Sequence, residues 1–217
     1  MSSISVQFHF DFGSPNSYLS HKVIPDIERR QGVRFEYFPV LLGGLFRLTG
    51  NRSPAEAFGG IKNKLEFGQL EMQRFIAKHG LTAYRHNPFW PVNTLQLMRG
   101  AVAAQMNGTF MPYVDAVFAT MWEQGLKMDD PAVIAQALDA AGLDGQTFQD
   151  RIADPDVKQA LIANTETSFR RGAFGSPTFF VGEEMFFGKD QLRDVEEEIQ
   201  AAKARLRAHD QDSSYVL

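Results

Sequence analysis

Hydrophobic and polar residues alternate at the start of the chain. Between residues 4 and 12 every second position is apolar: Ile4, Val6, Phe8, Phe10 and Phe12. This period of two is typical of a strand, and residues 33–40 repeat it. The stretch between opens with Ser-Pro at 14–15, which predicts a helix start. We therefore predict a strand, a helix to about residue 30 that Pro25 can kink, and a second, parallel strand.

The middle of the chain has a different pattern. Residues 41–45 and 50–54 are rich in glycine and turn formers and are predicted to be loops. Helices are predicted at about 60–79, 92–107 and 110–124, and two Asp-Pro pairs at 130–131 and 154–155 start further ones. From about residue 55 to 172 the sequence therefore predicts helices and little strand.

Alternation returns near the C-terminal end. Residues 174–181 read as a loop and then a strand, and 185–187 as its return strand after a turn at 182–184. A last helix is predicted to run to about residue 208. Neither end can bury a sheet alone, so we expect one α/β domain (residues 1–49 and 166–217) interrupted by an all-helical insertion (residues 50–165).

Composition narrows the function. The chain of 217 residues has no cysteine, which excludes disulfides, thiolate metal sites and a protein thiol nucleophile. A net charge of −4 without a basic cluster argues against a nucleic-acid partner. The first basic residue is Lys22 and no apolar run is long enough to span a bilayer, so we expect no secretory signal, no membrane partner and a cytoplasmic protein. The five histidines are scattered, so no metal site is expected.

Ser14 is the first candidate for chemistry, because it follows a strand and begins a helix. A helix N-terminus favours an anion, although an ordinary N-cap serine gives the same pattern. A Ser-His hydrolase is disfavoured, because His21 lies about 10 Å further along the helix axis. Ser14 can instead stabilise a bound thiolate. Lowering a thiol pKa by two units requires about 2.7 kcal/mol. A helix dipole supplies up to ~2 kcal/mol and a hydrogen bond to a charged group roughly 1.5–3 kcal/mol.

Pro177 is the second candidate, in Ser176-Pro177-Thr178 before a strand. A proline at the first position of a strand is common. A cis proline here would leave the backbone N–H and C=O of Ser176 free to pair with a peptide-like ligand.

Two segments together resemble a known family. Residues 10–19 read FDFGSPNSYL and resemble the start of the DsbA-like thioredoxin superfamily, whose redox members have Cys-Pro-x-Cys where this chain has Ser-Pro-Asn-Ser. Residues 174–178, FGSPT, resemble its cis-proline loop. The serine variant, with GGLF at 43–46, GNRSP at 50–54 and EMFFGKDQL at 184–192, is similar to kappa-class glutathione transferases and, within that group, to the 2-hydroxychromene-2-carboxylate isomerases. The resemblance covers nearly the whole chain and implies a thioredoxin-like fold.

The resemblance implies roles for individual residues. Ser14 would hold the glutathione sulfur as thiolate, and Ser176, beside Pro177, would pair through its backbone with the cysteinyl unit. The other implied glutathione-binding residues are Asn51, Pro54, Lys64, Asp190 and Gln191. Lys64 would face a glutathione carboxylate, and Asp190 and Gln191 the γ-glutamyl end. Gln191 departs from the family, where Arg is often found. Without the resemblance these are ordinary turn, surface and capping residues.

An aromatic loop at 87–93 is the candidate substrate site. Phe89 and Trp90 could stack on a flat aromatic substrate, and Asn93 or Arg99 could meet its carboxylate. Core aromatics and a surface arginine are the alternative interpretation.

The resemblance implies a glutathione-dependent isomerase acting on 2-hydroxychromene-2-carboxylate-like aromatic substrates. In that chemistry a thiolate adds reversibly to a conjugated carbon, the ring opens, a former double bond rotates and the thiol is expelled. One alternative is a kappa-like glutathione transferase or peroxidase. Another is a non-catalytic thioredoxin-like binding protein, which Gln191 keeps open. The family also implies a homodimer.

Overall fold

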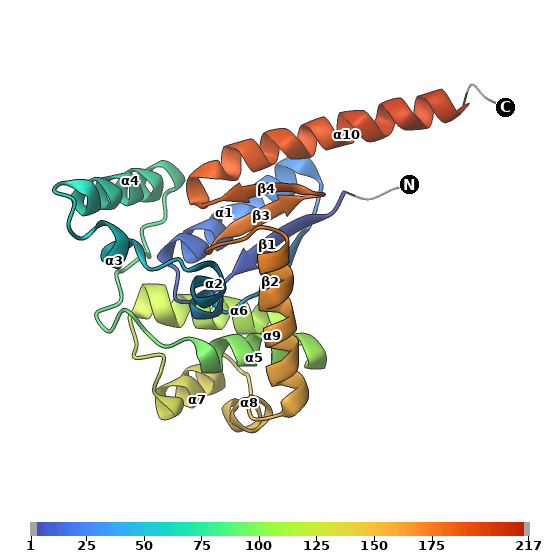
Figure 1. Cartoon of the computed structure of the whole chain (residues 1–217). Coiled ribbons are helices and arrows are strands. Elements are labelled where there is room, and N and C mark those ends of the chain that lie inside the picture. Colours follow the sequence, from blue (N-terminus) through green and yellow to red (C-terminus); the bar gives the residue numbers. More distant parts are fainter. Residues whose placement is uncertain (1–3, 215–217) are drawn as a thin grey trace.

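A four-stranded sheet organises the protein (Figure 1). The computed structural model describes the backbone of residues 4–214 and the side chains of residues 4–208. The strand order is β2-β1-β3-β4. Strand β1 (Val6–Phe10) pairs in parallel with β2 (Phe35–Pro39) and antiparallel with β3 (Thr178–Val181), which pairs antiparallel with β4 (Glu184–Phe187). Segments from the two ends of the chain therefore share one sheet, as the sequence predicts.

Helices lie on both sides of this sheet. Helices α1 (Pro15–Gln31) and α10 (Leu192–Ser214) pack together on one side, and α9 (Pro155–Arg170) packs on β2 from the other (Figure 1). The chain between β2 and β3 is helical. It forms α2 (Leu42–Thr49), α3 (Pro54–Phe58), α4 (Lys64–His79), α5 (Leu95–Asn107), α6 (Phe110–Ala119), a π-helical turn at Thr120–Gln124, α7 (Pro131–Ala140), α8 (Gly145–Arg151) and α9. The predicted thioredoxin-like fold with a helical insertion is confirmed.

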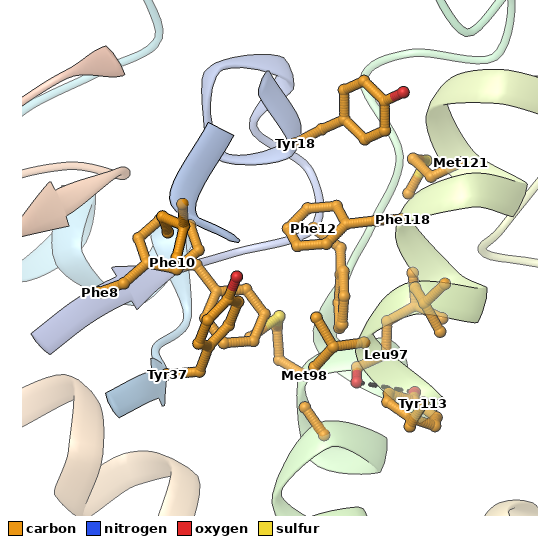
Figure 2. Close-up of a cluster of buried hydrophobic side chains, with 14 of the residues drawn as sticks. Phe8, Phe10, Phe12, Tyr18, Tyr37, Leu97, Met98, Tyr113, Phe118 and Met121 are labelled. Atoms are coloured by element: carbon orange, nitrogen blue, oxygen red, sulfur yellow. Dashed lines mark hydrogen bonds between the residues drawn. The ribbon is translucent and has the colours of Figure 1, made fainter. Parts of the chain in front are cut away.

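An aromatic core joins the sheet to the insertion. Phe10 and Phe12 continue the alternation of β1, and the Phe12 ring meets Phe118 of α6 with ring centroids 4.7 Å apart. Figure 2 shows this cluster between β1, α1 and the helices of the insertion. Burying these large rings supplies the main driving force for keeping the two parts together.

Several predicted boundaries were wrong, and four of them concern helix starts and ends. The glycine-rich segment 41–45 is not a loop, because α2 begins at Leu42. Glycine is needed there, since a Cβ on Gly44 would come within 3.0 Å of Thr165 in α9. Helix α4 begins at Lys64 rather than at residue 60, because Asn63 has a left-handed backbone (φ 68°). Helix α5 begins at Leu95 rather than at 92, and α10 continues past the predicted end at residue 208.

Candidate active site

Ser14 forms the N-cap of α1 and faces the loop before β3. Its Oγ accepts a hydrogen bond from the backbone N–H of Ser17 at 3.2 Å, and its hydroxyl donates to the backbone oxygen of Ser176 at 2.9 Å. The side chain is almost buried, with 5% of the residue exposed. The predicted helix start is confirmed, and the hydrogen bond from Ser14 to Ser176 is a contact that the sequence did not predict.

The peptide bond between Ser176 and Pro177 is cis. The backbone oxygen of Pro177 accepts a hydrogen bond from the N–H of Gly188 at 2.9 Å. The prediction of a free backbone at Ser176 was wrong for the carbonyl oxygen, because the hydroxyl of Ser14 occupies it. The Ser176 Oγ accepts from the N–H of Asp11 at 3.0 Å and shares a hydrogen bond with the Ser17 Oγ at 2.9 Å.

Asp11 is a buried residue of this site that sequence reasoning missed. Its side chain has no solvent exposure, and burial raises the pKa of its carboxyl above the ordinary value. One carboxylate oxygen accepts from the N–H of Gly13 at 2.8 Å and the other from the N–H of Leu42 at 2.8 Å. A polar residue between two phenylalanines of an alternating strand was the signal that could have identified it.

Two tryptophans of the insertion bind the turn before Ser14. The indole N–H of Trp90 donates to the oxygen of Gly13 at 3.0 Å, and that of Trp122 to the oxygen of Phe12 at 2.8 Å. The predicted substrate residue Trp90 therefore contacts the turn that carries Ser14. Trp122 holds the same turn but is fully buried.

The other predicted substrate residues are less directly connected to this turn. Phe89 is 50% exposed. Asn93 is exposed, and its side chain accepts the N–H of Leu95 at the start of α5. Arg99 is half-buried in the same helix. Among the residues that the structure describes, no hydrogen bond or ion pair joins these three residues to Ser14.

The predicted glutathione-binding residues fall into two groups: the first lies in or beside a segment that contacts the cis-proline loop, and the second, within the part of the chain that the structure describes, does not. Asn51 belongs to the first, because its amide donates to the oxygen of Phe174 at 2.9 Å and so reaches the cis-proline loop. Pro54 is the first residue of α3, three positions further along the chain. Lys64 belongs to the second group. It is exposed at the start of α4, with its ammonium 5.6 Å from the centre of the Phe58 ring.

Asp190 and Gln191 follow the end of β4 closely. Gly188, whose N–H binds Pro177, also accepts the N–H of Gln191 at 3.1 Å. The carboxylate of Asp190 pairs with the ammonium of Lys189 at 2.7 Å. Lys189 is itself buried, 5.1 Å from the centre of the Phe75 ring, so a cation that sequence reasoning missed stands beside the predicted γ-glutamyl contact.

Other kinds of site receive no support. The nitrogens of His21 face the Tyr37 hydroxyl (2.9 Å) and Asp115 (3.1 Å), so this histidine is engaged away from Ser14. Among the residues that the structure describes, no group of three His, Asp or Glu side chains is arranged to hold a metal ion. None of the described helices is long and apolar enough to cross a membrane.

The chain is similar to proteins of known function over most of its length. The 2-hydroxychromene-2-carboxylate isomerase of Pseudomonas putida is 26% identical over 187 residues, which cover 86% of this chain and 90% of that protein. Glutathione S-transferase kappa 1 of Homo sapiens is 22% identical, with 87% of both chains covered.

Solved structures show the same relationship. A 2-hydroxychromene-2-carboxylate isomerase structure superimposes with a TM-score of 0.76 at 25% identity, covering 95% of this chain and 98% of that one. A probable DsbA oxidoreductase of Streptomyces coelicolor reaches a TM-score of 0.72 at 18% identity and shares the fold. A family model described as a DSBA-like thioredoxin domain matches residues 5–200. The chain therefore belongs to the DsbA-like thioredoxin domain family.

Proposed function

We propose that the protein is a glutathione-dependent isomerase that acts on 2-hydroxychromene-2-carboxylate-like aromatic substrates. The observation that carries this proposal is the contact between the Ser14 hydroxyl and Ser176 beside a cis proline, in a chain without cysteine. The similarity to isomerases of that name over 86% of this chain supports it. A disulfide oxidoreductase of the usual kind needs cysteines at this position, and this chain has none.

The site offers candidate contacts for glutathione, because Ser14 and Ser176 present a hydroxyl and a backbone beside the cis proline. When bound, glutathione supplies the thiolate that adds reversibly to a conjugated carbon of the substrate. The backbone of Ser176 would hold the cysteinyl unit, and Asn51, Pro54, Lys64, Asp190 and Gln191 are the candidates for the remaining contacts. Lys64 is exposed at the start of α4, so its ammonium is accessible to a ligand carboxylate.

Rotation of one hydroxyl prepares the site for the sulfur. Ser14 now donates to the oxygen of Ser176. If this donor turns toward a bound sulfur, the Ser176 oxygen is released and can accept an N–H of the ligand. One protein hydrogen bond is exchanged for two with the ligand, of which the bond to the thiolate is the stronger because one partner is charged.

The α1 N-terminus adds to this stabilisation. Its first-turn N–H groups favour negative charge, and no basic side chain is required. Trp90, which binds Gly13, is the candidate platform for the aromatic substrate. These residues bind, orient and stabilise charge, while the reactive sulfur comes from the bound thiol.

Titration calorimetry with reduced glutathione, followed by spectral screening of chromene-carboxylate substrates, tests the proposal. Binding with isomerisation supports it. A protein that binds glutathione and conjugates electrophiles or reduces peroxides, without isomerising the substrates, would be the kappa-like transferase or peroxidase. The 22% identity to the human kappa enzyme is the reason to test for this alternative. Absence of glutathione binding would favour the non-catalytic thioredoxin-like binding protein.

We further propose a homodimer in the cytoplasm, where glutathione is kept reduced. Supporting this, the α3–α4 region exposes large apolar side chains, each between 38% and 55% exposed: Phe58, Ile61, Leu65, Phe67 and Leu70. Such a patch is typical of an interaction surface. Light scattering of the purified protein tests the dimer, and substitution of Ile61 and Phe67 by Ser should then yield a monomer.

A further inference from the structure

Asp11 joins more parts of the candidate site than any residue named so far. Its backbone oxygen accepts the N–H of Ser14 at 3.1 Å, and its backbone N–H donates to the Ser176 Oγ. Its carboxylate binds the N–H groups of Gly13 and Leu42. The turn before Ser14, the cis-proline loop and the start of α2 therefore meet at one buried side chain.

The contacts indicate the charge state of Asp11. Both carboxylate oxygens accept an N–H group, so neither is needed as a hydroxyl donor. Burial, the largest influence, raises the pKa of the Asp11 carboxyl, while the N–H groups of Leu42 and Gly13 and a side-chain hydrogen bond from Thr94 lower it. Because each oxygen faces an N–H donor, the geometry favours a buried carboxylate whose partners are neutral dipoles.

This carboxylate lies close to where a second anion is proposed to bind. Within the described residues no ion pair includes Asp11, so no cation offsets its charge. The groups that face it are the backbone of α2 and of the Ser14 turn, the Thr94 hydroxyl from the insertion and the Ser176 hydroxyl from the cis-proline loop. His9, the nearest titratable residue in the chain, is held by Ser168 and Gln7.

We propose that Asp11 is a positioning residue that holds the Ser14 turn, and that its negative charge sets the pH at which a sulfur bound at Ser14 ionises. This inference rests on the proposed function. Two like charges in one buried site disfavour each other, so Asp11 opposes the α1 dipole and the Ser14 hydroxyl and keeps the thiol pKa from falling further. The ionisation of the Asp11 carboxyl and that of the bound thiol are therefore coupled, and each affects the pKa of the other.

A thiol introduced at position 14 tests this without glutathione. Because the chain has no cysteine, Ser14→Cys gives a single thiol whose ionisation is followed by thiolate absorbance. Adding Asp11→Asn should lower the pKa of this thiol by about one unit, a tenfold change in proton affinity. Glu36→Gln removes the same charge from an exposed site on β2 and should leave the thiol pKa unchanged.

Thr94→Val keeps the test decisive if Asp11→Asn does not fold. Losing this hydroxyl raises the pKa of the Asp11 carboxyl and so favours its neutral form. With less negative charge nearby, the thiol pKa should fall as in Asp11→Asn, but by less. An unchanged or higher thiol pKa in the folded variants would overturn the proposal, even if turnover falls, because loss of packing alone does not move that pKa downward. Failure of the wild-type chain to bind glutathione would instead count against the proposed function.

Discussion

The hydroxyl of Ser14 donates to the backbone oxygen of Ser176 at 2.9 Å, across the gap between the first helix and the cis-proline loop. These two residues lie far apart in the sequence, and the antiparallel pairing of β1 with β3 brings them together. The contact uses the same two groups that a bound thiol with a peptide backbone would need. Two further hydrogen bonds, from the Asp11 N–H and between the hydroxyls of Ser17 and Ser176, join the same segments.

Replacing Ser14 by Ala should raise the pKa of bound glutathione thiol by about 1–2 units and lower turnover by roughly 10- to 100-fold. The reason is loss of a hydrogen bond to a charged sulfur, which contributes roughly 1.5–3 kcal/mol. Thiolate absorbance of the glutathione complex as a function of pH measures the first effect, and steady-state kinetics the second. An unchanged titration would remove Ser14 from this role.

Ser53→Ala is a matched control for that variant. Ser53 is also an N-cap serine followed by proline, and it caps α3 through the N–H of Glu56. Both substitutions remove a helix cap, which costs about 1 kcal/mol. Only Ser14→Ala should alter the thiol, so an equal effect of the two variants would indicate loss of stability rather than loss of a sulfur ligand.

Periodicity predicted the first two strands, because their apolar positions alternate in the sequence, whereas β3 is buried at every position and β4 is mostly exposed, so these two were located from the short apolar runs on either side of a turn. It failed at α2, where two glycines indicated a loop. The helix forms because Leu45 is buried, Asp11 accepts the first N–H group and α9 packs closely on Gly44. These are long-range contacts, and local propensity does not contain them.

The site was predictable where a motif marks a backbone feature. Ser14 could be inferred because a helix start has a local signature, and the cis Pro177 because residues 174–178 resemble the cis-proline loop of a known family. Asp11, Ser17 and Lys189 were missed because their side chains contact residues that only the fold brings near, namely Leu42, Ser176 and Phe75 respectively. The hydrogen bond from the Leu95 N–H to the Asn93 side chain was missed because the sequence placed the start of this helix at residue 92 rather than at Leu95.

Trp90→Phe should lower kcat by about 2- to 10-fold, with a smaller effect on the affinity for an aromatic substrate. Phenylalanine keeps an aromatic platform but loses the N–H that binds the oxygen of Gly13, a net contribution of about 0.5–1.5 kcal/mol. Steady-state kinetics separates kcat from KM. Equal losses for Trp90→Phe and Trp90→Ala would show that the hydrogen bond, not the ring surface, accounts for the whole effect.

Gly100→Ala should destabilise the protein by about 1–3 kcal/mol, because a Cβ at this position in α5 would lie 2.1 Å from the hydroxyl oxygen of Tyr113. That hydroxyl already donates to the oxygen of Leu97 at 2.9 Å and cannot move freely (Figure 2). Gly68→Ala in α4 is the control. Nothing lies within 4 Å of its Cβ, so it should stabilise the protein by roughly 0.5–1 kcal/mol. Urea unfolding measures both, and a neutral Gly100→Ala would contradict the packing described here.

His9 should make the protein less stable in mild acid. Its ring lies between Phe38 and Phe180, with centroids 4.4 Å and 4.8 Å away, and its Nδ1 shares a hydrogen bond with the Ser168 Oγ at 2.9 Å. Burial, followed by the charge of Arg171, lowers the pKa of His9 from 6.5 to about 3. The unfolded chain therefore takes up a proton near pH 6.5 that the folded chain excludes until about pH 3.

The stability that His9 contributes is consequently complete above about pH 6.5 and is lost as the pH falls, at about 1.4 kcal/mol per pH unit. Asp11 acts with the opposite sign, since a raised carboxyl pKa favours the folded state at low pH. Comparing variants isolates the histidine. His9→Gln should flatten the pH dependence of the free energy of unfolding between about pH 6.5 and 4.5, whereas His86→Gln, at an exposed position, should leave it as in the wild type. Equal slopes for His9→Gln and the wild-type protein would mean that the folded state admits the proton, and would place the acid sensitivity in the carboxylates instead.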